Sequence, residues 1–174
     1  DWINDKITIT DTDNSLDLTT NWSLSAWIKP WASMWAFTWI IWKRTWDTTS
    51  TIEYWLLINS DYKLRLNTCN WSITNALDSI SALTQWVWVH IVATWDNWDY
   101  KIYINTVLDN SSTWGINAQA STNAINIWSR TWSTAWFVWD IDEIWIWGTT
   151  LSASQVAMLY NSGAWISYDE FNSL

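Results

Sequence analysis

The sequence has little of several residue types that usually shape a protein of its size. Its 174 residues include 1 cysteine, 1 proline, 3 glycines and 8 lysine or arginine residues. The single cysteine, Cys69, excludes an internal disulfide and a thiolate metal cluster, and we expect it to be a half-buried strand residue. No apolar run approaches the roughly 20 residues of a membrane-spanning helix, so membrane insertion is not expected.

The shortage of basic residues leaves a net charge of −9. Binding a nucleic-acid backbone or an anionic membrane needs lysine and arginine patches, so we expect neither as a partner. The length suits one domain with a substantial core. Because the chain starts at Asp1 inside a structural unit, we expect residues 1–174 to be a single domain from a larger protein. Its first strand is then truncated, and other domains of the same polypeptide are its neighbours.

Tryptophan is present in excess, and it stands where turns require glycine. There are 22 tryptophans, and Trp2, Trp71 and Trp98 each follow an aspartate or asparagine. Turn positions with positive φ favour glycine, because a Cβ is strained there. We therefore hypothesise that many of these codons are UGA, read as glycine by the source organism and as tryptophan in this translation.

The recoding hypothesis has a simple check and one alternative. If only five tryptophans are genuine, the chain has about 20 glycines, roughly 11% of its residues, which suits a turn-rich β protein. The five taken as genuine are Trp22, Trp27, Trp88, Trp95 and Trp147. The alternative is a truly tryptophan-rich carbohydrate-binding or interface protein. UGG codons at Trp2 and Trp98 would refute the recoding.

Alternation of side chains predicts ten or so short strands. The clearest pattern is Trp86–Asp109, which we interpret as a two-stranded hairpin with Asn97 and Trp98 at its turn. A type I′ turn needs positive φ at both central residues, so Trp98 is a misfit there. The other expected strands are 6–10, 23–29, 40–43, 51–59, 62–67, 71–76, 124–127 and 137–147, with a mixed connection at 78–84 and a polar loop at 111–122.

One helix is expected after the last long strand. Ser152 is a good N-cap, and Gln155 three residues later completes a capping box. Gly163 is expected to end the helix, and residues 166–168 to add an edge strand. Many short strands and one short C-terminal helix predict an all-β antiparallel sandwich.

With the suspect tryptophans read as glycine, five segments resemble laminin-G-like members of the concanavalin A-like lectin/glucanase superfamily. They cover essentially the whole chain in the family's order. They are Asp1–Asp5, Ser23–Pro30, Trp88–Asp96, Tyr103–Leu108 (where Thr106 departs from the family's glycine), and Trp139–Ile144 followed by Leu151–Val156. The resemblance implies a jelly-roll β-sandwich. It also implies a non-catalytic extracellular or cell-surface module that serves adhesion or binds glycan or protein ligands.

Relatives of this fold hydrolyse glycans with paired carboxylates, so Asp140, Asp142 and Glu143 are the candidate acids. Retaining hydrolysis needs two carboxyl groups about 5–5.5 Å apart. On a regular strand Glu143 faces away from the two aspartates, and only a bulge would change that. We therefore expect no catalytic residues, and keep a glycoside hydrolase and a purely structural spacer as alternatives. The sole histidine, His90, is expected to be a partly buried strand residue with a hydrogen-bond partner.

A structural calcium ion is the other chemistry open to the acidic residues. Calcium takes six to eight oxygen ligands from carboxylates and carbonyls. Asp1, Asp5 and Asp142 are best placed to bind it if the first and last long strands pair, as the resemblance suggests. The same acids can instead accept backbone N–H bonds in turns. Residues 31–39, 44–50 and 111–122 are the loops we expect to carry a ligand site.

Overall fold

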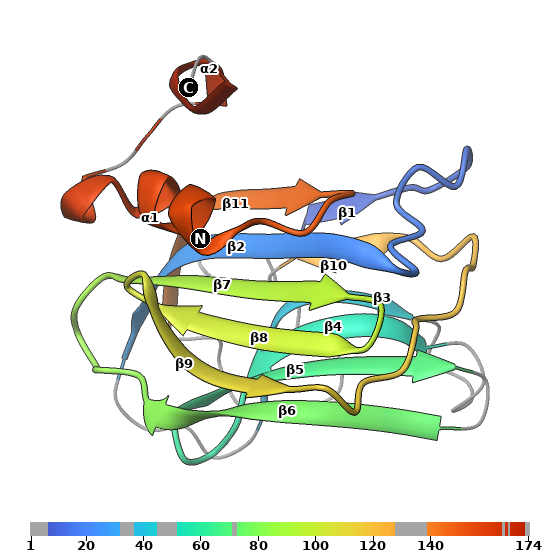
Figure 1. Cartoon of the computed structure of the whole chain (residues 1–174), viewed down its shortest axis with the longest axis horizontal. Coiled ribbons are helices and arrows are strands. Elements are labelled where there is room, and N and C mark those ends of the chain that lie inside the picture. The colour runs from blue at the N-terminus through green and yellow to red at the C-terminus, as the bar shows by residue number, and fades with distance from the viewer. Residues whose placement is uncertain are drawn as a thin grey trace.

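The computed structural model describes residues 7–31, 37–44, 52–70, 73–127, 139–164, 166 and 168–172. Strands and two short helices make up most of this part of the chain (Figure 1). The strands are β1 (Ile7–Ile9), β2 (Asn21–Pro30), β3 (Thr38–Arg44), β4 (Ile52–Ile58), β5 (Lys63–Asn70), β6 (Ile73–Ala82), β7 (Val89–Asp96), β8 (Asp99–Ile104), β9 (Val107–Ser112), β10 (Ile125–Ile127) and β11 (Trp139–Trp147). The helices are α1 (Ala153–Tyr160) and α2 (Tyr168–Asn172), with a 3-10 turn at Asn161–Gly163.

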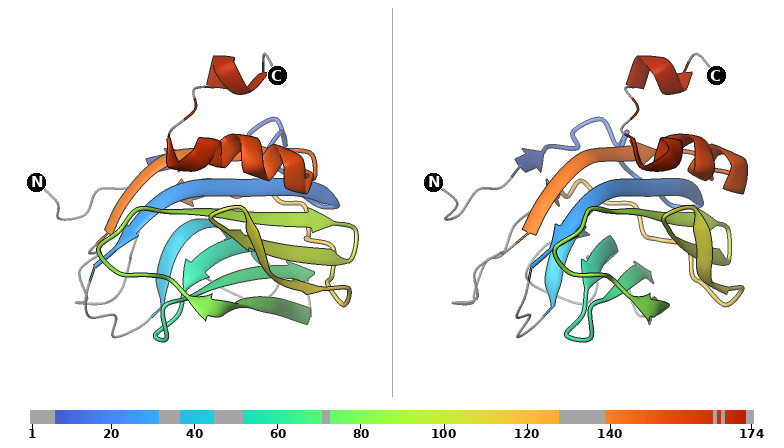
Figure 2. Two further views of the ribbon diagram at one scale, coloured as in Figure 1. Left: turned by 60° about the vertical axis from the view of Figure 1, so that its left-hand side comes forward. Right: turned by 90° about the vertical axis from the view of Figure 1, so that its left-hand side faces the viewer.

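Two antiparallel sheets pack face to face. One has the strand order β1-β10-β3-β4-β5-β6 and the other the order β11-β2-β7-β8-β9. Both orders pair strands that are far apart in sequence, such as β11 with β2 and β1 with β10. The predicted all-β antiparallel sandwich is therefore confirmed, and Figure 2 shows the two layers together with α1 above β11 and β2.

The core between the sheets is built from inward-facing aliphatic residues around a few aromatic rings. Trp22 and Trp95 are fully buried there, with ring centroids 6.5 Å apart, and Tyr54 packs 5.3 Å from Trp22. A second apolar cluster lies on the outer face of the six-stranded sheet and includes Cys69, which is 1% exposed. Cys69 is thus a strand residue as predicted, but more deeply buried.

The helix α1 begins as its sequence indicates. The Ser152 side chain accepts the N–H of Gln155, and the Gln155 side chain accepts the N–H of Ser152, which completes the capping box. The helix ends at Asn161, whose φ of 44° is left-handed, and Ser162 (φ of 57°) and the expected Gly163 (φ of 89°) follow in the left-handed region as well. Val156 and Leu159 bury the apolar side of α1 on the outer face of the five-stranded sheet, against Val92 and other residues.

Three of the predicted secondary-structure assignments are wrong. Residues 78–84 were expected to be a mixed connection, but the strand β6 runs without a break to Ala82. The strand β9 was missed, because its residues alternate weakly and carry an exposed valine and leucine at 107 and 108. Tyr168, which was expected to belong to an edge strand at residues 166–168, instead begins α2.

Backbone strain is found at Thr106, in the hairpin that follows the central one, and not at Trp98. Asn97 has φ of 54°, but Trp98 is not left-handed, so the turn lacks the two positive φ values of type I′. The next hairpin has both: Asn105 has φ of 46° and Thr106 has φ of 74°. A β-branched residue with positive φ is strained. Trp86, with φ of 65°, is the one left-handed tryptophan in the described residues.

Thr106→Gly should therefore stabilise the protein. Glycine removes a left-handed penalty of about 1–2 kcal/mol, partly offset by its larger entropy loss on folding. We expect a net gain of about 1 kcal/mol and a higher melting temperature. Thr113→Gly is the matched control, because Thr113 is exposed and not left-handed. A Thr106→Gly variant that melts no higher than the Thr113→Gly variant would contradict the assignment of strain.

Candidate functional site

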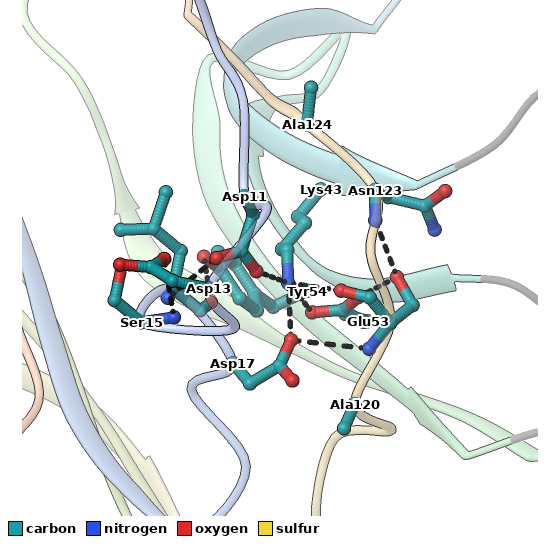
Figure 3. Close-up of polar contacts among 12 residues, drawn as sticks. Asp11, Asp13, Ser15, Asp17, Lys43, Glu53, Tyr54, Ala120, Asn123 and Ala124 are labelled. Carbon is teal, nitrogen blue, oxygen red and sulfur yellow. Dashed lines mark hydrogen bonds and ion pairs between the residues drawn. The ribbon is translucent and has the colours of Figure 1, made fainter.

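A buried lysine surrounded by carboxylates is the main polar feature of the described residues (Figure 3). The Nζ of Lys43, on β3, lies 2.7 Å from Asp11 Oδ2, 2.5 Å from Asp17 Oδ1 and 2.8 Å from Glu53 Oε2. It also donates to the carbonyl oxygen of Ser121 over 2.8 Å. The side chains of Lys43, Asp11 and Glu53 are at most 1% exposed, and that of Asp17 is 15% exposed. We call Lys43, Asp11, Asp17, Glu53 and Ser121 the Lys43 cluster.

The Lys43 cluster ties two irregular segments to the six-stranded sheet. Asp17 Oδ1 accepts the backbone N–H of Ser121 at 3.2 Å, which joins the segment between β1 and β2 to the segment between β9 and β10. The Ser121 hydroxyl donates to Glu53 on β4. Asp11 Oδ1 accepts the N–H of Leu16 at 3.2 Å, and Tyr54 donates to the Leu16 carbonyl at 3.1 Å. These contacts hold both segments at one end of the sandwich.

Burial and ion pairing set the protonation of this cluster. Burial raises the pKa of Glu53 to about 7, although hydrogen bonds from Lys43 and Ser121 act in the opposite direction. Burial alone would lower the pKa of Lys43, but hydrogen bonds to Asp11, Asp17 and Glu53 outweigh it and raise that pKa. Lys43 is therefore a permanent internal cation. We did not predict this cation from the sequence, although a lysine directly after the apolar run Ile40–Trp42 was an available signal.

The candidate catalytic acids lie on β11, and a bulge changes their predicted directions. The pairing of β11 with β2 shifts register after Asp142, and Glu143 has φ of 47°. Glu143 lines a pocket together with Trp27, the residue that pairs with Asp142. Our expectation that Glu143 faces away from the two aspartates is therefore wrong, because the bulge inserts an extra residue.

Each of these acids already has a partner. Asp140 lies 3.7 Å from Lys29 Nζ. Asp142 Oδ1 accepts the N–H of Glu143 at 2.8 Å, and Glu143 Oε2 accepts the indole N–H of Trp145 at 2.9 Å. The pocket that Glu143 lines lies beneath α1 and has room for about one water molecule. A sugar ring does not fit in that space.

His90 lines the same pocket and is more isolated than predicted. It is 2% exposed and packs against Trp27 and Tyr160, at ring-centroid distances of 5.1 and 6.0 Å, while those two rings stack on each other at 5.6 Å. Its Nδ1 is buried and has no hydrogen-bond partner among the described residues, while the backbone N–H of His90 donates to Asn105 Oδ1 at 2.9 Å. Burial lowers the pKa of His90 from 6.5 to about 4. His90 is therefore a neutral packing residue at neutral pH.

His90 should make the fold sensitive to acid. Since its pKa is lowered on folding, its contribution to stability is complete above pH 6.5 and is lost as the pH falls to about 4. Between pH 6.5 and pH 4 we expect the free energy of unfolding of wild-type protein to fall by on the order of 3 kcal/mol more than that of His90→Phe. Urea unfolding at pH 4.5 and pH 7 measures this difference. Equal losses for the two proteins would mean that His90 does not titrate as described.

The predicted calcium ligands are only partly within the described residues. Asp1 and Asp5 lie outside them, while Asp142 is half-buried on β11. The strand pairing that brought the three together in our prediction is wrong, because β1 pairs with β10 and β11 pairs with β2. Across the described ranges, no group of three or more His, Cys, Asp and Glu residues is arranged to hold a metal ion.

Of the predicted ligand loops, only the segment after β9 lies wholly within the described residues. Residues 113–124, which we call the β9–β10 segment, cross the end of the sandwich. The N–H of Ala118 donates to Thr19 on one side, and the N–H of Gln119 donates to the Cys69 carbonyl on the other. Thr68 donates to the Ile116 carbonyl at 2.8 Å. The segment is thus a fixed surface and not a free loop.

The sequence matches one family over most of its length. A laminin G family model, described as the concanavalin A-like lectin/glucanases superfamily, matches residues 3–157. The chain therefore belongs to this superfamily. No curated protein matches the sequence.

Several solved structures share this fold. A structure from work on the entry of botulinum neurotoxin type C, described as dependent on two ganglioside molecules, has a TM-score of 0.67 at 18% identity and covers 92% of this chain and 40% of its own. The receptor-binding domain of type G neurotoxin has a TM-score of 0.64 at 20% identity, covering 91% and 42%. Domain 4 of AbnA, an extracellular GH43 arabinanase from Geobacillus stearothermophilus in complex with arabinotriose, has a TM-score of 0.63 at 21% identity, covering 81% and 66%.

These similarities establish the fold and no more. The chain spans about two fifths of the toxin chains and just under two thirds of the arabinanase domain. The binding sites of the toxin chains can therefore lie in parts of those chains that have no counterpart in this protein. Among the described residues no helix is long and apolar enough to cross a membrane.

Proposed function

We propose that this member of the superfamily is a non-catalytic module that binds glycan or protein ligands. We propose further that it works outside the cell or at the cell surface, in adhesion, as one domain of a larger polypeptide. The observation that carries the proposal is that the candidate catalytic acids are already paired with other side chains. Asp140 is paired with Lys29 and Glu143 with Trp145, beside a pocket with room for about one water molecule.

The comparisons support this proposal without naming a ligand. The similar structures include toxin receptor-binding domains and an arabinanase domain in complex with arabinotriose. A glycan or a protein surface is thus the class of partner to test first. Function depends on a site and not on a fold, so the ligand has to be found by measurement.

A glycoside hydrolase is the second candidate, and the bulge in β11 is the observation that favours it. The bulge turns Glu143 into the pocket that Trp27 also lines, and Trp27 is the residue that pairs with Asp142 across the two strands. Two acids on one face are the minimum for glycan hydrolysis. A purely structural spacer domain is the remaining alternative.

A glycan array and a hydrolysis assay separate these functions. We expect the purified domain to retain one class of glycan, with arabino-oligosaccharides and sialylated glycans among the probes, and to release no reducing sugar. Asp142→Asn and Glu143→Gln should leave retention within about twofold, since both acids are already engaged in hydrogen bonds within β11. Hydrolysis that disappears in Glu143→Gln would establish the enzyme, and neither binding nor hydrolysis would favour the spacer.

Calcium at Asp1, Asp5 and Asp142 stays a proposal, which a thermal melt can test in the same preparation. A bound ion stabilises only the folded state, so added calcium should raise the melting temperature. Asp142→Asn should reduce that rise. An unchanged melting temperature at millimolar calcium would count against the site.

A further inference from the structure

The Lys43 cluster has more acceptors than its lysine can satisfy. An ammonium group carries three hydrogens, but four oxygens lie 2.5–2.8 Å from Lys43 Nζ. With three ionised carboxylates around one ammonium, two negative charges stay uncompensated. Buried charges without partners are costly, so the cluster favours one additional proton.

The contacts of each carboxyl group indicate which one takes that proton. Asp11 and Asp17 each accept a backbone N–H, from Leu16 and Ser121, and such a donor favours the ionised form. Glu53 contacts the hydroxyl of Ser121 instead. A hydroxyl both donates and accepts, so Ser121 Oγ can accept a hydrogen bond from protonated Glu53 in place of the one that it donates to ionised Glu53. Glu53 is therefore the carboxyl group best suited to being protonated.

We propose that the Lys43 cluster is a proton-operated latch on the β9–β10 segment. With Glu53 protonated, Asp17 stays against Lys43 and holds Ser121 onto the sandwich. When Glu53 ionises, the Asp17 carboxylate turns toward solvent and releases the N–H of Ser121. Asp17 is the group that moves, because its side chain is the most exposed of the three.

Three titratable groups near Glu53 keep their charge state over this pH range. Lys43 and Tyr54 have raised pKa values, so the lysine stays charged and the phenol stays neutral. Asp13, beyond Asp11 on the β1–β2 side, has a lowered pKa and stays ionised. Asp11 and Asp17 are the remaining acids near Glu53. Because the pKa of Glu53 is raised to about 7, its contribution to stability is complete below about pH 4.5 and is lost as the pH rises through 7.

The release is local. The first half of the β9–β10 segment is held elsewhere, since Gln119 donates to the Cys69 carbonyl and Ala118 to the Thr19 carbonyl. Only the part around Ser121 and Asn123, whose N–H donates to the Ser121 hydroxyl, depends on the latch. A ligand that contacts this part would be held with a pH-dependent affinity. The latch contains no tryptophan, so it is unaffected by the codon hypothesis.

Amide hydrogen exchange of the whole chain at pH 6 and pH 8, corrected for intrinsic rates, tests the latch. In wild-type protein we expect protection of Ser121 and Asn123 to fall by about tenfold at pH 8, since one pKa unit corresponds to a factor of ten. Gln119, in the same segment, should be unchanged. Glu53→Gln mimics the protonated acid and should keep both amides protected at both pH values.

Asp17→Asn provides the second variant. It removes one negative charge from the cluster, so the fall in protection of Asn123 should shrink to less than about threefold. Equal protection of Ser121 and Asn123 at both pH values in wild-type protein would overturn the proposal. An unchanged fall in Glu53→Gln, or an equal fall at Gln119, would also overturn it, because the opening would then be independent of Glu53 or global.

Discussion

The buried ammonium of Lys43 is the interaction on which one end of the sandwich depends. Two sheets pack through an ordinary apolar core, but the segments between β1 and β2 and between β9 and β10 contribute few core residues. They are joined instead through carboxylate and carbonyl oxygens around Lys43 Nζ. A protein can place a metal ion at such a junction; here a side chain supplies the positive charge, at the cost of burying an ion-pair network.

Burial and charge also determine how stability depends on pH at two sites in the domain. Beneath α1, His90 is buried without a partner for Nδ1 and remains neutral, so acid acts against the fold. Around Lys43, Glu53 holds its proton more tightly when folded, so base acts against the fold. The two contributions have opposite signs between about pH 4.5 and 6.5, and they partly cancel there.

Local patterns allowed much of the fold to be predicted. The capping box at Ser152 and Gln155, the central hairpin and the two-layer sandwich all follow from side-chain periodicity and turn chemistry. The bulge at Glu143 was not predictable, because the extra residue shows only against the partner strand. Lys43 was missed for a related reason: its three acidic partners lie 32, 26 and 10 positions away in sequence, and only the fold brings them together. The recoding of tryptophan codons stays a hypothesis about the gene.

Unfolding of Lys43→Met tests most directly whether a buried cation holds this end of the domain together. Methionine fills similar volume but leaves the carboxyl groups of Asp11, Asp17 and Glu53 without a cation, so we expect the free energy of unfolding at pH 7 to fall by about 3–5 kcal/mol. Lowering the pH to 5 should restore part of that loss, because protonation neutralises the carboxyl groups. A Lys43→Met variant as stable as wild-type protein at pH 7, or one that gains nothing at pH 5 relative to wild type, would contradict the account.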